Sequence, residues 1–153
     1  MYYSGQEIIE IALRIEENGY AFYTAAAETF SDSNDTKSLF LDLAEKELTH
    51  IAIFQKLADR FDAENFEFNA DEASGYMFHL ADSHLFGKPG AGAELAKTVH
   101  TPKEALAIAY KFENDSVDFY EELLKRTETN AKKLISQIIE EEKEHAAEIK
   151  QFM

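Results

Sequence analysis

Cysteine is absent from this chain of 153 residues. That absence excludes a disulfide framework, a thiol nucleophile and any iron centre bound by thiolates. The chain also lacks an apolar run of the roughly 18 to 20 residues that a membrane span needs, and it lacks the charged and apolar pattern of a signal peptide. We therefore expect a cytoplasmic protein that has no membrane partner.

Positive charge is scarce, because 15 Lys and Arg residues face 30 Asp and Glu residues and give a formal net charge of −15. Such a surface repels phosphate groups, so we expect no nucleic-acid partner. Hydrophobic residues make up 45% of the chain, which favours a folded core over disorder. The length fits a single domain that spans residues 1–153.

Two Glu-x-x-His motifs recur 95 residues apart, and a lone glutamate with a tyrosine seven residues downstream precedes each of them. The motifs are Glu47–His50 and Glu142–His145, and the preceding pairs are Glu16 with Tyr23 and Glu113 with Tyr120. Residues i and i+3 of an α-helix lie on one face, so the glutamate and histidine of a motif can reach the same metal pair. Four carboxylates and two imidazoles in this order are typical of a carboxylate-bridged dimetal site inside a four-helix bundle.

The hydrophobic pattern places these residues on the inward faces of four predicted helices, in apolar stripes with steps of three and four. The stripes are Ile9, Leu13, Glu16, Tyr20, Tyr23, Ala27 and Phe30; Phe40, Leu43, Glu47, His50, Phe54, Leu57 and Phe61; Leu106, Tyr110, Glu113, Val117, Tyr120 and Leu124; and Ile135, Ile138, Glu142, His145, Ile149 and Phe152. A buried, unpaired carboxylate is costly, and a pair of cations compensates for four of them most simply. The neighbouring acids lie off the stripes and are expected on solvated faces: Glu17, Glu45, Glu140, Glu141, Glu144 and Glu148.

The predicted organisation is a duplicated helical hairpin, with helix pairs over 4–61 and 101–153 and a crossover over 62–100. Residues 4–7 and 101–104 read as capping boxes that open the first and third helices, the second with proline at its first helical position. A long crossover is required when the second and third helices of a bundle run in the same direction.

The crossover is expected to hold a short helix that is capped by Asn69 with Glu72 and reaches about Phe86. A glycine-rich break over 87–92 follows, and then one or two helical turns over 93–99. Three histidines here lack the spacing of the motif pairs, so they are expected at the surface, at an interface or in a secondary metal site: His79, His84 and His100.

The crossover is also rich in apolar side chains for a surface connection: Phe66, Phe68, Tyr76, Met77, Phe78, Leu80, Leu85 and Phe86. A large uncovered apolar patch usually marks an interface, so we expect a two-fold symmetric homodimer with residues 71–86 in or beside the contact. The alternative is a lid that packs entirely on its own bundle.

The segments 16–23, 45–50, 113–120 and 140–145 resemble the ferritin-like superfamily and, within it, the rubrerythrin-type di-iron proteins. The resemblance implies an all-α, ferritin-like four-helix bundle with a long helical crossover between its second and third helices. It also implies roles for the motif residues, with Glu47 and Glu142 bridging two metal ions, Glu16 and Glu113 as terminal carboxylates, and His50 and His145 each completing the ligands of one metal. Tyr23 and Tyr120 either hydrogen bond to ligand carboxylates or only pack between helices.

Two departures from rubrerythrins limit what is carried over. Rubrerythrins carry a further glutamate one turn after the third-helix ligand, and Ser116 stands at that position here. They also carry a cysteine-bound, rubredoxin-like iron module that delivers electrons. Because this chain has no cysteine, we expect its electrons to come from a separate donor protein.

The resulting hypothesis is a di-iron oxidoreductase that reacts two bound ferrous ions with hydrogen peroxide or dioxygen in defence against oxidative stress. Manganese and zinc are alternative metals, because carboxylate and imidazole ligands suit all three. Two other functions stay open: an iron-handling protein with a ferroxidase step that feeds storage, and a non-catalytic, metal-stabilised interaction module.

Overall fold

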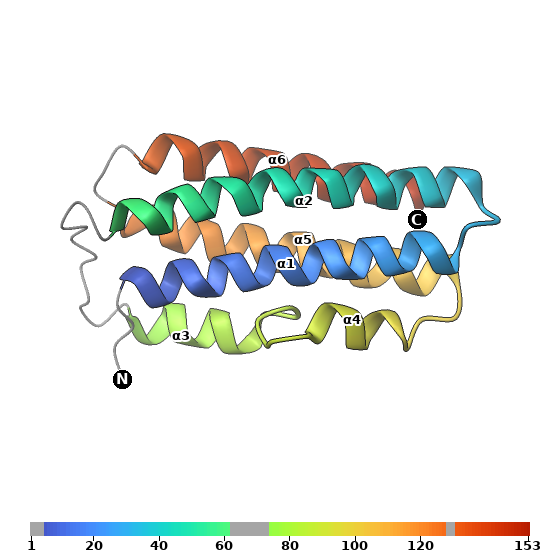
Figure 1. Ribbon diagram of the computed structural model, residues 1–153, viewed down its shortest axis with the longest axis horizontal. Helices are drawn as coiled ribbons and strands as arrows, with labels where there is room; N and C mark the ends of the chain where they lie inside the picture. The colour runs from blue at the N-terminus through green and yellow to red at the C-terminus, as the bar shows by residue number, and fades with distance from the viewer. Residues whose placement is uncertain (1–4, 62–73, 128–130) are drawn as a thin grey trace.

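The computed structural model describes residues 5–61, 74–127 and 131–153, and within them every regular element is an α-helix. Four long helices run along one axis (Figure 1): α1 (Gly5–Thr29), α2 (Asn34–Phe61), α5 (Pro102–Lys125) and α6 (Ala131–Phe152). Two short helices, α3 (Ser74–Ser83) and α4 (Ala91–Ala96), lie between α2 and α5 in the chain. The predicted all-α, ferritin-like four-helix bundle is confirmed.

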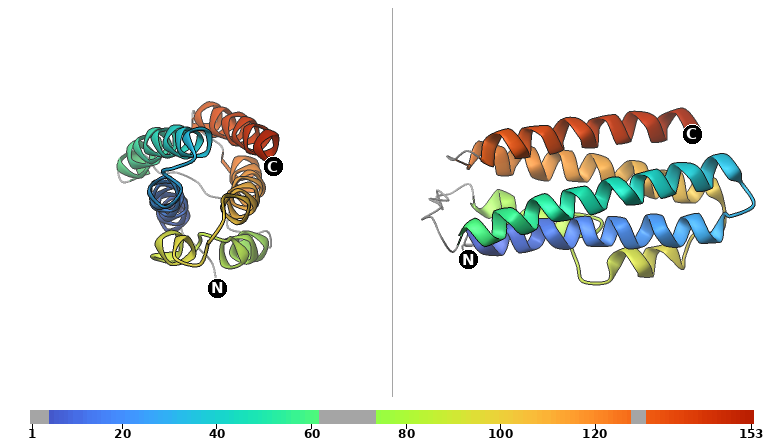
Figure 2. Two further views of the ribbon diagram at one scale, coloured as in Figure 1. Left: turned by 90° about the vertical axis from the view of Figure 1, so that its right-hand side faces the viewer. Right: turned by 45° about the horizontal axis from the view of Figure 1, so that its top comes forward.

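The bundle consists of two antiparallel hairpins, α1 with α2 and α5 with α6, and their helices make the most extensive contacts in the molecule. The helices α2 and α5 run in the same direction, so the chain must return along the bundle between them (Figure 1). Viewed down the bundle, α3 and α4 lie beside α1 and α5, whereas α2 and α6 adjoin each other on the opposite side (Figure 2). One side of the bundle is therefore covered by the crossover and the other is not.

The start of α5 follows from its local sequence. The Thr101 hydroxyl accepts a hydrogen bond from the Glu104 amide at 3.2 Å, and the Glu104 carboxylate accepts one from the Thr101 amide at 3.3 Å. Pro102 occupies the first helical position, where no amide hydrogen is needed. The predicted capping box is thus present here, whereas the caps predicted at Ser4 and Asn69 lie outside the described residues.

The four predicted stripes form most of the core, with two corrections. Tyr20 is 37% exposed, because the inward position is taken by Gly19, against which the Phe112 ring packs. Phe152, the last residue of α6, is 43% exposed.

The crossover is anchored on the bundle by Asn18 of the first hairpin and by its equivalent in the second, Asp115, whose carboxylate accepts a hydrogen bond from the Leu85 amide at 3.2 Å. The Asn18 amide donates to the carbonyls of Phe86 and Lys88 at 2.8 and 2.7 Å, and its oxygen accepts from the Gly92 amide at 3.2 Å. Gly92 must lack a side chain, since a Cβ there would lie 2.0 Å from the Asn18 carbonyl oxygen. These bonds replace the intrahelical bonds that the segment between α3 and α4 forgoes.

The helix α3 ends at Ser83 rather than near Phe86 as predicted. The reason is local, because the Phe86 amide donates to the Nδ1 atom of His84 at 3.0 Å and turns the chain out of the helix. His84 was expected at the surface or at an interface, but it is only 5% exposed and lies inside the molecule. His79 and His100 are exposed.

Most of the described apolar crossover residues pack on their own bundle, as the lid alternative predicted. Met77 and Phe86 are buried, Leu80 and Leu85 pack against the core, and only Tyr76 among them is largely exposed, at 53%. The remaining apolar residues of this set, 66, 68 and 78, lie outside the described side chains. The homodimer stays a prediction.

In the described part of the chain, no helix is both long enough and apolar enough to cross a membrane.

Candidate metal centre

Each long helix brings one glutamate to the middle of the bundle, and α2 and α6 each add a histidine one turn later. All six side chains are 0 to 2% exposed: Glu16, Glu47, His50, Glu113, Glu142 and His145. We call this set the six-residue cluster. It includes every metal-ligand candidate that the repeated motifs predicted.

The cluster divides into two overlapping groups of four residues. In each group, every residue offers one ligand atom, and these four atoms all lie within 4.8 Å of one another. Glu16 and His50 belong only to the first group, and Glu113 and His145 belong only to the second. Glu47 and Glu142 belong to both groups. The geometry therefore offers two adjacent metal positions with two carboxylates between them.

Both histidines direct the Nδ1 atom towards the carboxylates. The Nδ1 atom of His50 lies 3.2 Å from Glu16 Oε2 and 3.3 Å from Glu142 Oε1. The Nδ1 atom of His145 lies 3.1 Å from Glu142 Oε2 and 3.5 Å from Glu113 Oε2. The two rings stack with centroids 5.7 Å apart, so each imidazole faces its own group from the same side of the bundle.

The two tyrosines link the hairpins reciprocally. The Tyr23 hydroxyl on α1 donates to Glu113 on α5, and the Tyr120 hydroxyl on α5 donates to Glu16 on α1. Burial and the acceptor carboxylate raise the pKa of each hydroxyl well above its ordinary value, so both remain proton donors. Each bond fixes one carboxylate oxygen of a glutamate that belongs to a single group.

Several buried carboxylate oxygens have no hydrogen-bond partner among the described residues: both oxygens of Glu47, Oε2 of Glu113 and Oε1 of Glu142. A buried polar atom without a partner costs about 1 to 3 kcal/mol, and more when it is charged. Cations between the two shared glutamates would satisfy these atoms together. The donor set thus fits a pair of metal ions that prefer carboxylate and imidazole ligands.

Without cations, protons must compensate the cluster. Burial and the neighbouring glutamates raise the pKa of Glu47 and of Glu113 well above the ordinary carboxyl value. Burial lowers the pKa of the imidazoles, but nearby carboxylates outweigh it and raise the pKa of His50 to about 12 and of His145 to about 9. The pKa of Glu142 is lowered despite burial, since it accepts bonds from its neighbours. Metal binding would release such protons.

Gly19 brings the helices together at the cluster. A Cβ atom at this position would lie 2.6 Å from the Phe112 ring and 2.9 Å from Glu47 Oε2. The sequence pattern did not predict this role for Gly19, although glycine inside a helical pattern often marks a close approach.

Ser116 is the equivalent residue of the second hairpin, and its hydroxyl pairs with the Nε2 atom of His84 at 3.1 Å. A serine bonded to the crossover thus stands one turn after Glu113.

Glu141 was expected on a solvated face, and its side chain is 34% exposed, but it also contacts a residue of the cluster. Its Oε2 atom lies 2.7 Å from the Nε2 atom of His50, and its Oε1 atom accepts from Gln137 at 3.0 Å. The hydrophobic stripe could not reveal this contact, because Glu141 lies at the edge of α6 and reaches sideways to an imidazole on α2. The other off-stripe acids are exposed or partly exposed.

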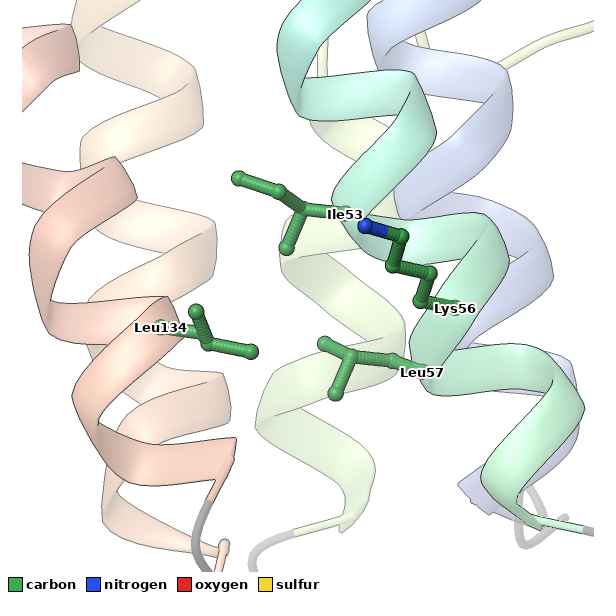
Figure 3. A pocket seen from close by; sticks show the side chains of 4 residues that line it. All are labelled: Ile53, Lys56, Leu57 and Leu134. Carbon is green, nitrogen blue, oxygen red and sulfur yellow. The ribbon is translucent and has the colours of Figure 1, made fainter.

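The seam between α2 and α6, on the side away from the crossover, is hollowed at two places. A pocket of about 340 Å³ lies beside the histidines, lined by Lys46, Thr49, Glu141, Glu144 and His145; we call it the seam pocket. An apolar hollow of about 230 Å³ lies nearer the α2 C-terminus, where Ile53, Lys56 and Leu57 face Leu134 of α6 across a gap (Figure 3). One member of the cluster, His145, therefore lines a pocket in this seam.

The comparisons with known proteins agree with this geometry. A protein-family model described as Rubrerythrin matches residues 7–153. No curated protein and no solved structure gives a significant match.

Proposed function

Because the chain belongs to the rubrerythrin family, we propose that it is a di-iron oxidoreductase that reduces hydrogen peroxide or dioxygen. The observation that supports this proposal is the pair of overlapping four-residue groups that share Glu47 and Glu142. Two shared carboxylates could hold two metal ions next to each other, which would suit reactions that take two electrons at once.

In this proposal each residue has a defined task. Glu47 and Glu142 would provide ligands to both metals, Glu16 with His50 would hold one ion, and Glu113 with His145 would hold the other. Two ferrous ions held there would supply the two electrons needed to cleave the O–O bond of a peroxide, and two protons would complete the two water molecules formed.

The surroundings would hold the ligands still and keep the site dry. Tyr23 stacks against Phe40 and Tyr120 packs against Phe54, with ring centroids 5.9 and 5.2 Å apart, so buried aromatic rings flank both tyrosine–glutamate bonds. Each hydroxyl keeps its proton on the bond to a terminal carboxylate. The proton cannot be lost to water, and the carboxylate keeps one oxygen for the metal.

We further propose that the electrons that restore the ferrous state come from a separate protein, since the chain has no cysteine to hold an iron–thiolate module of its own. A role in oxidative-stress defence, a cytoplasmic location and a homodimer belong to the same proposal.

Anaerobic loading with ferrous iron, followed by peroxide or dioxygen in separate experiments, tests the proposal by visible absorbance. We expect two iron ions per chain and rapid oxidation by peroxide. Faster oxidation by dioxygen with iron retained would instead favour an iron-handling ferroxidase. If neither peroxide nor dioxygen oxidises the bound iron, the result would favour a non-catalytic, metal-stabilised interaction module. The matched controls are Glu47→Gln, which should lose the reaction, and Glu140→Gln on the exposed face, which should keep it.

A further inference from the structure

The two halves of the six-residue cluster have the same ligands but different neighbours behind their imidazoles. The Nε2 atom of His50 is bonded to Glu141 Oε2 at 2.7 Å. In the duplicated sequence, the equivalent of Glu141 beside His145 is Lys46, because both residues directly precede a shared glutamate. A carboxylate thus stands behind one imidazole, whereas the residue at the matching sequence position near the other is a lysine.

The Lys46 ammonium is engaged elsewhere, since it lies 3.1 Å from Glu148 Oε2. Among the described residues, every hydrogen bond and ion pair of His145 involves its Nδ1 atom, and its Nε2 atom has no protein partner. Yet the residue is only 2% exposed, and its ring lines the seam pocket. The imidazole of His145 therefore borders this pocket, and its Nε2 atom has no hydrogen-bond or ion-pair partner among the described residues.

A carboxylate bonded to the outer nitrogen of a ligand histidine fixes the ring and raises its basicity, and removing such a partner typically costs about 10- to 100-fold in metal affinity. His50 has this support and His145 lacks it. The seam pocket also carries the carboxylates of Glu141 and Glu144, which attract divalent cations.

We infer that the two metal positions are unequal: the position at His50 holds its ion tightly, and the position at His145 exchanges divalent cations through the seam pocket. Glu141 acts as a positioning residue for His50, because it would act on the metal only through the imidazole. This inference rests on the metal pair of the proposed function, but it does not require that the pair reacts with an oxidant.

Anaerobic release of ferrous iron to an excess of a ferrous chelator, followed by absorbance, tests the inference. From protein loaded with two ions per chain we expect two phases of equal amplitude, with rates that differ about 10-fold or more. Glu141→Gln, which keeps an acceptor but removes the charge, should accelerate the slow phase much more than the fast phase, on which Glu141 acts only through its charge in the seam pocket.

Two further variants locate the effect. Lys46→Glu provides the missing carboxylate near His145 and should slow the fast phase. Glu140→Gln makes the same charge change as Glu141→Gln on a side chain that is 73% exposed, and it should change neither phase. At one ion per chain, anomalous scattering should place the metal between Glu16 and His50.

A single release phase in the wild type would overturn the inference, as would equal acceleration of both phases by Glu141→Gln. Occupancy beginning at His145 would also overturn it. Failure of the proposed function would give a different result: the protein would still bind two ions that are released at different rates, but these ions would not react with peroxide or dioxygen.

Discussion

The α1–α2 hairpin and the α5–α6 hairpin carry the same ligand pattern in different surroundings. Both contribute a lone glutamate, a Glu-x-x-His motif and a tyrosine that bonds across to the other hairpin. The two hairpins differ at residues that lie near the predicted ligands without belonging to them: Gly19 is matched by Ser116, and Lys46 is matched by Glu141. The groups that would touch the metals are thus repeated, whereas the groups that support them are not.

The largest expected effect tests whether the two shared glutamates are equivalent. Glu47→Gln and Glu142→Gln should each lose at least one of two metals, because a single amide oxygen cannot bridge a pair. The apo proteins should differ, since neither oxygen of Glu47 has a hydrogen-bond partner among the described residues, while Glu142 hydrogen bonds to His145 and lies within ion-pair distance of His50. Apo Glu47→Gln should be as stable as the apo wild type or more stable, and apo Glu142→Gln should lose about 3 kcal/mol.

Metal analysis and urea unfolding of the chelator-treated proteins measure both quantities. Equal apo stabilities would contradict this difference, and a marked loss for Glu47→Gln would mean that its carboxylate makes a structural bond.

The second prediction uses pH to separate the two histidines in the apo protein. The folded-state pKa is about 12 for His50 and about 9 for His145, both above the ordinary value near 6.5. A group with a raised folded pKa stabilises the fold below its unfolded pKa and loses that contribution as the pH rises through the folded pKa. Apo stability should therefore fall above about pH 6.5, by up to about 1.4 kcal/mol per pH unit for each proton, and the raised pKa values of Glu47 and Glu113 act in the same direction.

The slope should lessen above about pH 9, where folded His145 has lost its proton and His50 has not. Urea unfolding of the apo protein from pH 6 to pH 10 measures the slope, with metal-loaded protein as the control. An apo stability that rises with pH in this range would contradict the assignment.

The third prediction tests the reciprocal tyrosine bonds. Tyr23→Phe and Tyr120→Phe each remove the partner of a buried carboxylate oxygen and should each destabilise the apo protein by about 1.5 to 3 kcal/mol. The two losses should be nearly equal, because the bonds are symmetric. If only one variant is destabilised in chemical unfolding, the hairpins differ here as well.

The smallest expected effect concerns Gly19 and Ser116, which occupy matched positions of the two hairpins. Gly19→Ala should destabilise by about 1 to 3 kcal/mol, because its Cβ would meet the Phe112 ring and the Glu47 carboxylate. Ser116→Ala should cost about 1 kcal/mol, since it leaves His84 without its hydroxyl partner. Only Gly19→Ala should also weaken metal binding, which titration of both variants with ferrous iron would show. Equal metal affinities would contradict the contact with Glu47.

The sequence predicts those parts of the molecule that follow from helical periodicity. The steps of three and four brought the six cluster residues to one place, and the capping box at Thr101 and Glu104 started α5. Side chains that reach across helices do not follow from periodicity. Glu141 contacts His50 from outside the stripe of its own helix, and only the packing of α2 beside α6 reveals it.

The crossover illustrates the same limit. Its length follows from the direction of the helices it joins, but its path is set by bonds between distant residues, such as those of Asn18 with Phe86 and Lys88. His84 could not be assigned from the sequence, because its burial depends on Ser116 of another helix.

The central claim is that two metal ions lie side by side between Glu47 and Glu142. Anomalous scattering from a metal-loaded crystal, recorded at the iron, manganese and zinc edges, tests it most directly. The account predicts two peaks about 3.5 to 4 Å apart, both bonded to the two shared glutamates, one also to Glu16 and His50 and the other to Glu113 and His145. A single peak, or peaks only at exposed carboxylates such as Glu140, would contradict it.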